Sequence, residues 1–122
     1  MKGRRTEWTC EEVHERLASA LPQAAIHSEY GMTELMSQAY ARKEGKFEAP
    51  PWLRVTIVEP DDPMVDAPHG RTGRIRLTDL ANLHSCPFID TDDLGRMTPQ
   101  GQFEVIGRFE SADVRGCSLL TV

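Results

Sequence analysis

A single helical pattern, followed only by short extended patterns, is the feature that most constrains the fold of this chain. The helical pattern begins at a capping box, in which the Thr9 hydroxyl can accept from the Glu12 amide and the Glu12 carboxylate from the Thr9 amide. Pro22 ends the pattern. Apolar side chains recur along it at three- and four-residue spacing: Cys10, Val13, Leu17 and Leu21. They predict one long N-terminal helix with an apolar stripe that packs against the remainder of the domain.

The remainder of the chain is predicted to form strands. Four runs of β-type residues are bounded by Pro, Gly or Asp turns: residues 52–58, 72–78, 88–91 and 103–106. The second run places Ile75 and Leu77 on one face, and a shorter apolar run at residues 24–26 predicts a further, buried strand. Met36 and Tyr40 are predicted to lie in the core. One long helix and at least four strands predict a β-rich α+β fold.

The length and charge limit the classes of protein to be considered. A chain of 122 residues, 39% of them hydrophobic, can bury one modest core, as one domain or part of one. Its net charge of -5 disfavours binding to nucleic acid, which requires a basic excess. No apolar run approaches the ~20 residues of a membrane helix, and no signal-peptide pattern follows the basic residues 1–5. We therefore expect no nucleic-acid partner and no membrane span.

The cysteines indicate the redox environment. Cys10, Cys86 and Cys117 are odd in number and form no C-x-x-C pair, so neither a disulfide framework nor a structural zinc site is indicated. This usage favours the cytoplasm. We expect Cys86 to be a core residue rather than half of a Cys/His pair with His84.

Residues 27–34, His-Ser-Glu-Tyr-Gly-Met-Thr-Glu, are dense in groups that suit a nucleotide. Gly31 lets the backbone approach a ligand, and the Tyr30 ring offers a flat face. Thr33 and Glu34 supply a hydroxyl for a phosphate oxygen and a carboxylate for Mg²⁺. The alternative is a strand-to-loop turn that needs Gly31 for its conformation and places Tyr30 in the core.

Three later segments extend this pattern. They are Thr-Asp-Asp-Leu-Gly-Arg at residues 91–96, Pro-Gln-Gly-Gln-Phe-Glu-Val-Ile-Gly-Arg-Phe-Glu at 99–110, and Arg-Gly-Cys at 115–117. With residues 30–34, their order and spacing resemble the motifs of the adenylate-forming superfamily, which includes acyl-CoA synthetases, peptide-synthetase adenylation domains and luciferases. The resemblance covers nearly the whole chain. It implies that residues 1–122 are the β-rich C-terminal part of the large adenylating domain, without a second domain.

The resemblance implies ATP and Mg²⁺ as cofactors and gives each residue of the first motif a role. Tyr30 and Gly31 would line the adenine. Thr33 would contact the α-phosphate during catalysis, and Glu34 would hold the Mg²⁺ ion.

The later motifs add contacts to the ribose. By the resemblance, Asp93 would accept hydrogen bonds from both ribose hydroxyls, and Arg108 would reach the ribose or a phosphate. Asp92 stands where the superfamily often has Gly, and Glu110 replaces the hinge Asp. Two alternatives remain open: the two adjacent aspartates cap a turn, or Arg108 is a solvated partner of Glu104 or Glu110.

The C-terminal sequence looks most like that of acyl-protein synthetases of the LuxE type. These enzymes activate a fatty acid with ATP, accept the acyl group on a cysteine near their own C-terminus, and serve a bacterial long-chain fatty-acid reductase. The resemblance implies that Cys117 accepts the acyl group as a thioester, with Arg115 favouring the thiolate, and that an acyl reductase is a partner. The alternative for Cys117 is a buried packing residue.

The sequence therefore predicts ATP-dependent activation of a fatty or other carboxylic acid as an acyl-adenylate, followed by transfer to a cysteine thiol. The Gly/Ser/Thr-rich phosphate loop with its Lys does not occur in these residues. We therefore expect the N-terminal half of the same enzyme as a partner, and an isolated chain that is inactive. The alternatives are a fragment of an acyl-CoA, phenylacetate-CoA or coenzyme F390 ligase, or a non-catalytic remnant.

Overall fold

The computed structural model describes residues 8–109. In this range one α-helix, α1, precedes seven strands, and a short 3₁₀-helix, η1, follows the fifth strand. Their bounds are α1 (Cys10–Ala20), β1 (Ser28–Tyr30), β2 (Ala39–Ala41), β3 (Lys46–Glu48), β4 (Leu53–Val58), β5 (Gly73–Asp79), η1 (Leu80–Asn82), β6 (Phe88–Met97) and β7 (Phe103–Arg108). The predicted β-rich α+β fold, with one long helix and at least four strands, is confirmed.

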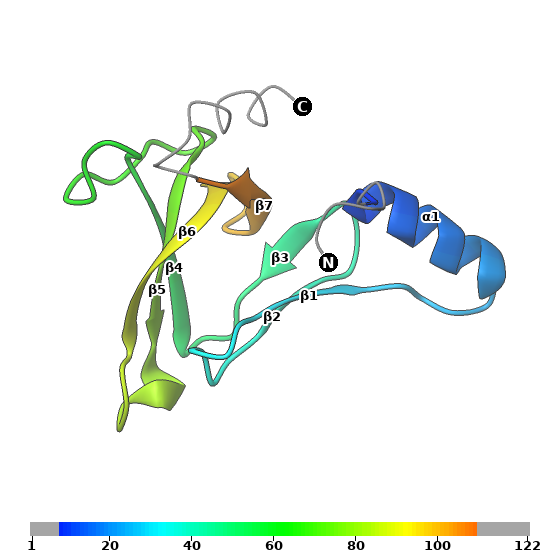
Figure 1. Ribbon diagram of the computed structural model, residues 1–122, viewed down its shortest axis with the longest axis horizontal. Coiled ribbons are helices and arrows are strands. Elements are labelled where there is room, and N and C mark those ends of the chain that lie inside the picture. The colour runs from blue at the N-terminus through cyan, green and yellow to red at the C-terminus, as the bar shows by residue number, and fades with distance from the viewer. Residues whose placement is uncertain (1–7, 110–122) are drawn as a thin grey trace, which may run out of the picture.

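The strands form one antiparallel sheet in the order β1-β2-β3-β7-β6-β5-β4. The strand β7 lies between β3 and β6, so that Phe103 pairs with Phe47 on one side and with Met97 on the other. The ribbon of β1–β3 runs across the direction of β4–β6 (Figure 1). This order brings segments from the beginning, middle and end of the described chain into one region.

The core lies along the inward face of this sheet. The prediction for β5 is correct, because Ile75 and Leu77 are fully buried while Arg74 and Arg76 on the opposite face are half-buried. The buried apolar cluster also draws on β1, β2, β3, β4 and β7: Tyr30, Leu35, Ala39, Ala41, Phe47, Leu53, Ile57, Ile75, Leu77 and Phe103.

The helix α1 begins as predicted but does not bury its apolar stripe. The Thr9 amide donates to Glu12 Oε2 at 2.8 Å and the Glu12 amide donates to Thr9 Oγ1 at 3.2 Å, which completes the capping box. No residue of α1 is buried, and Leu17 is 40% exposed. The reason is position: α1 lies beside the β1 end of the sheet (Figure 1), where His14 Nε2 is 2.8 Å from Ser28 Oγ.

Three local predictions are wrong. Residues 24–26 form no strand, because β1 pairs with β2 only from Ser28 onwards. Met36 is exposed in the loop before β2, and Tyr40 is exposed because the alternation of β2 turns its two alanines inward and Tyr40 outward. Cys86 is exposed in the loop after η1, where its thiol donates to the Phe88 carbonyl at 3.3 Å. Within residues 8–109, no helix is long and apolar enough to cross a membrane.

Candidate nucleotide site

Tyr30, Asp93 and Arg108 meet around one carboxylate. The Tyr30 hydroxyl donates to Asp93 Oδ2 at 2.7 Å, and Arg108 Nε lies 3.5 Å from Asp93 Oδ1. These residues come from β1, β6 and β7, and Asp93 and Arg108 are cross-strand partners. Three of the residues for which the sequence predicts contacts to a nucleotide are therefore brought together, although far apart in the chain.

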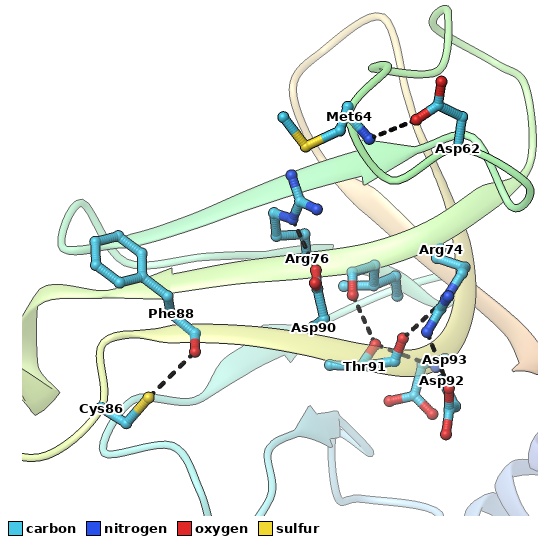
Figure 2. A network of polar contacts seen from close by, with 11 residues as sticks. Asp62, Met64, Arg74, Arg76, Cys86, Phe88, Asp90, Thr91, Asp92 and Asp93 are labelled. Atoms are coloured by element: carbon cyan, nitrogen blue, oxygen red, sulfur yellow. Dashed lines mark hydrogen bonds and ion pairs between the residues drawn. The ribbon is translucent and has the colours of Figure 1, made fainter.

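A bulge in β6 directs the Asp93 carboxylate. Between the pairs Arg74–Leu94 and Arg76–Asp90, one residue of β5 faces three residues of β6, which removes the normal ladder at this point. Thr91 replaces it, because its hydroxyl donates to the Ile75 carbonyl at 2.7 Å and accepts from the Asp93 amide at 3.1 Å (Figure 2). The bulged backbone is thus held in place while the Asp93 side chain stays 20% exposed.

The adjacent Asp92 carboxylate has different partners. Asp92 Oδ1 lies 3.1 Å from Arg74 Nη2, and its side chain is 60% exposed (Figure 2). Both aspartates lie within β6, so neither caps a turn. Glu104, a possible partner of Arg108, instead pairs with Arg96. Arg108 therefore keeps an exposed guanidinium beside Asp93.

Tyr30 is a core residue whose hydroxyl reaches the site. Its ring packs edge-on against Phe103, at a centroid distance of 5.5 Å, and against Phe47 at 6.0 Å. Burial, and then the hydrogen bond and charge of Asp93, raise the pKa of Tyr30 well above its usual value. The hydroxyl consequently remains a neutral donor at physiological pH and orients the Asp93 carboxylate.

Thr33 and Glu34 lie in the loop between β1 and β2, and both side chains are exposed. No contact joins either side chain to Asp93 or Arg108 within residues 8–109. Gly31, which precedes them, does not have a positive φ, so the turn does not require glycine for its conformation. It is exposed, and a Cβ added to it would lie 3.3 Å from Gln38 Cγ.

The sequence reasoning missed Asp79, which holds this loop. Asp79 is fully buried, and its carboxylate accepts from the amides of Met36 and Ser37 at 2.8 and 3.0 Å and from the Ser37 hydroxyl at 2.6 Å. Burial tends to raise the pKa of Asp79, but the hydrogen bonds from Ser37, Met36 and Ala81 outweigh it and lower that pKa. A signal existed in the sequence, since Asp79 occupies the same inward parity of β5 as Ile75 and Leu77.

Glu34 is the residue that the resemblance implies as a ligand to Mg²⁺. Within residues 8–109, no three His, Cys, Asp or Glu side chains converge as metal ligands. Mg²⁺ commonly takes only one or two carboxylates and completes its shell with phosphate oxygens and water. A single carboxylate, that of Glu34, is compatible with this mode of binding.

Two cavities formed by the described residues lie away from this carboxylate. One of about 490 Å³ is lined by the start of α1, the β2–β3 turn and parts of β6 and β7, and one of about 310 Å³ lies along β5 and β6. Neither is lined by Asp93 or Tyr30. Cys117, Arg115 and Glu110 lie outside the described residues, whereas Cys10 and Cys86 are free and exposed.

The fold of the described residues is similar to that of a β-rich part of solved adenylate-forming enzymes. The luciferase-like enzyme from the nonluminescent mealworm Zophobas morio matches with a TM-score of 0.64 and 20% identity, over 85% of this chain and 30% of that enzyme. A protein described as a putative long-chain-fatty-acid CoA ligase from Rhodopseudomonas palustris matches with a TM-score of 0.60 and 22% identity, over 84% of this chain and 30% of that protein.

The O-succinylbenzoate coenzyme A synthetase of Bacillus subtilis, in complex with AMP, matches with a TM-score of 0.58 and 20% identity, over 76% of this chain and 24% of the synthetase. The chain thus spans between 24% and 30% of the length of these three structures. No protein-family model matches the sequence, and the comparison with curated proteins found no match. At these identities the similarity establishes the fold.

Proposed function

We propose that this chain is the ribose- and phosphate-contacting part of an ATP-dependent, AMP-forming acyl ligase. The observation that carries the proposal is the cluster of Tyr30, Asp93 and Arg108, in which a partly exposed carboxylate is held by a neutral donor and a cation. A fixed carboxylate is the acceptor that two adjacent hydroxyls require. The AMP complex of the Bacillus subtilis synthetase and the ATP-bound MatB of Rhodopseudomonas palustris support a nucleotide ligand for this fold.

Each residue of the site has a role in this proposal. Each carboxylate oxygen can accept more than one hydrogen bond, so Asp93 can hold the Tyr30 hydroxyl and the ribose hydroxyls together. The exposed guanidinium of Arg108 interacts with the ribose or a phosphate. Thr33 and Glu34 meet the phosphate end, where Glu34 supplies one ligand to Mg²⁺. The magnesium ion neutralises phosphate charge when it is bound.

The reaction is the formation of an acyl-adenylate. The carboxylate oxygen of the acid attacks the α-phosphorus of ATP, an acyl–phosphate bond forms, and the bond to the bridging oxygen breaks with release of pyrophosphate. A carboxylate is a poor electrophile, and this step converts it into an activated acyl group. The protein contributes orientation and charge stabilisation.

Further polypeptide is part of the proposal. The Asp93 side chain is 20% exposed within the described residues, and we propose that a second wall closes the nucleotide cleft over it. We propose that the N-terminal half of the same enzyme supplies that wall, the phosphate loop and the acid pocket, while residues 1–122 form one unit. The isolated chain is then expected to bind nucleotide without forming acyl-adenylate.

The acceptor of the acyl group distinguishes the finer proposals. By its resemblance to LuxE-type enzymes, the chain would belong to a cytoplasmic acyl-protein synthetase that transfers a long-chain fatty acyl group to Cys117 and then to an acyl reductase. If CoA is the acceptor, the enzyme is a ligase of the acyl-CoA, phenylacetate-CoA or coenzyme F390 type. A non-catalytic remnant would neither activate an acid nor accept an acyl group.

Removing hydroxyls from the ligand tests the ribose site directly. AMP should bind the chain at least about tenfold more tightly than 2′,3′-dideoxy-AMP, because loss of both hydroxyls leaves the Asp93 carboxylate without its partners. Isothermal titration calorimetry measures both affinities, and adenine alone serves as the control for base binding. Equal affinity for AMP and the dideoxy analogue would contradict the proposed role of Asp93.

A further inference from the structure

The loop that carries Thr33 and Glu34 combines exposed side chains with an anchored main chain. On the far side of the loop, Asp79 Oδ2 accepts from the amides of Met36 and Ser37, and Asp79 Oδ1 accepts from the Ser37 hydroxyl. A second anchor is Asn82, whose side-chain amide donates to the Glu34 carbonyl at 2.9 Å and to the Cys86 carbonyl at 3.1 Å. The end of β5 and η1 therefore hold the loop on both sides of Leu35.

Asp79 is an unusual residue for this position on energetic grounds. It is 0% exposed, no ion pair within residues 8–109 involves it, and the charge is balanced only by hydrogen-bond donors. The fourth donor is the Ala81 amide at 3.1 Å, which also ties η1 to the network. Burying a carboxylate costs desolvation free energy, whereas an apolar side chain, like those of Ile75 and Leu77 on the same face of β5, does not carry this cost. We therefore infer that the hydrogen bonds to Asp79 serve to fix the conformation of the β1–β2 loop relative to η1.

We propose that Asp79 is a positioning residue, assisted by Asn82, that sets the β1–β2 loop so that Thr33 and Glu34 face the phosphate end of the bound nucleotide. This inference rests on the proposed function. Asp79 touches no ligand itself, because its carboxylate is enclosed by the loop and η1.

The loop anchor is structurally separate from the ribose site. Tyr30, Asp93 and Arg108 bond one another across β1, β6 and β7, whereas Asp79 acts from the end of β5. No hydrogen bond joins the two groups within residues 8–109. Loss of the anchor should therefore weaken contacts to the phosphates and Mg²⁺ and leave contacts to the ribose in place.

Hydrogen exchange and nucleotide binding on the 122-residue chain test the inference. Asp79→Asn keeps the shape of the side chain but removes its charge and replaces one acceptor oxygen with an amide. The amides of Met36 and Ser37 should then exchange at least about tenfold faster. Affinity for AMP should stay within about twofold, while the gain in affinity from AMP to Mg²⁺-ATP falls.

Thr98→Val is the matched control. Thr98 is also buried, and its hydroxyl accepts from the Gln102 amide at 3.1 Å in the β6–β7 turn, away from the loop. This variant should lower global stability without a selective effect on residues 33–37. If Asp79→Asn fails to fold, Asn82→Ala removes only the half-buried second anchor and should loosen the same residues to a smaller extent.

Two results would overturn the inference. One is unchanged exchange of the Met36 and Ser37 amides in a folded Asp79→Asn chain, and the other is an equal loss of affinity for AMP and for Mg²⁺-ATP, which would make Asp79 a general packing residue. Failure of the unmodified chain to prefer AMP over its dideoxy analogue is a different outcome, because it counts against the ribose site while the exchange rates still decide whether Asp79 orders the loop.

Discussion

Asp92 and Asp93 are adjacent carboxylates that the strand β6 places in different surroundings. Asp93 receives the Tyr30 hydroxyl and lies beside Arg108, whereas Asp92 pairs with Arg74 in solvent. A strand sends neighbouring side chains to opposite faces, and the bulge held by Thr91 sets which of the two turns inward. Of these two aspartates, we therefore propose Asp93 as the ligand-binding carboxylate.

The contribution of the Tyr30 hydroxyl to AMP binding can be measured separately from that of its ring. Tyr30→Phe keeps the packing against Phe47 and Phe103 but leaves Asp93 Oδ2 without its donor. We expect affinity for AMP to fall by about threefold to tenfold, as for the loss of one hydrogen bond to a charged group. Calorimetric titration measures the change.

A second tyrosine provides the control for that substitution. Tyr40→Phe removes an exposed hydroxyl from the cross-strand partner of Glu29 and should leave the affinity for AMP unaltered. If both variants bind AMP like the unmodified chain, Tyr30 is a core residue without a part in orienting Asp93.

At the scale of the element, Gly95 is required by the close approach of β6 and β7. A Cβ at Gly95 would lie 2.5 Å from the Glu104 carbonyl oxygen and 2.8 Å from Ile75 Cδ1, and a backbone oxygen in a paired strand cannot move away easily. Gly95→Ala should therefore lower the free energy of unfolding by about 1–3 kcal/mol, as overpacking does. Urea denaturation followed by circular dichroism measures the loss.

Gly107 in the facing strand is the matched comparison, because a Cβ there meets no atom within 4 Å. Gly107→Ala should change the free energy of unfolding by less than about 0.5 kcal/mol. Comparable losses in the two variants would mean that the close packing around Gly95 does not limit stability.

The elements also indicate how far the sequence could predict this fold. The capping box and the alternation of β5 are local signals, so they correctly placed the start of α1 and the inward faces of Ile75 and Leu77. The predictions of a strand at residues 24–26 and of a buried Tyr40 were wrong. Both features depend on how strands pair, and pairing is not a local property of the sequence.

At the scale of the molecule, the sheet order accounts for what the sequence could not provide. Motif residues could be named from the resemblance, but the contact of Tyr30 with Asp93 depends on the way β7 inserts between β3 and β6. The same order brings Arg108 beside Asp93. Asp79 was missed because its partners, on the β1–β2 loop, lie about forty residues earlier in the chain.

The transfer step is a prediction about the complete enzyme. Cys117→Ser should leave acid-dependent release of pyrophosphate intact and abolish hydroxylamine-sensitive labelling by a radioactive fatty acid, because an alkoxide forms far less readily than a thiolate. Cys86→Ser and Cys10→Ser, which remove exposed thiols, should still label. Label that persists without Cys117, or disappears only with Cys86, would make Cys117 a packing residue and remove the main mechanistic support for an acyl-protein synthetase over a CoA ligase.

The most direct measurement of the central claim compares the two adjacent aspartates in AMP binding. Asp93→Ala should weaken binding of AMP by at least about tenfold, since it removes a charge-assisted contact to the ribose. Asp92→Ala, on the same strand but paired with Arg74, should bind AMP within about twofold of the unmodified chain. Equal affinities for all three proteins, or a larger loss in Asp92→Ala, would contradict the assignment of the nucleotide site to Asp93.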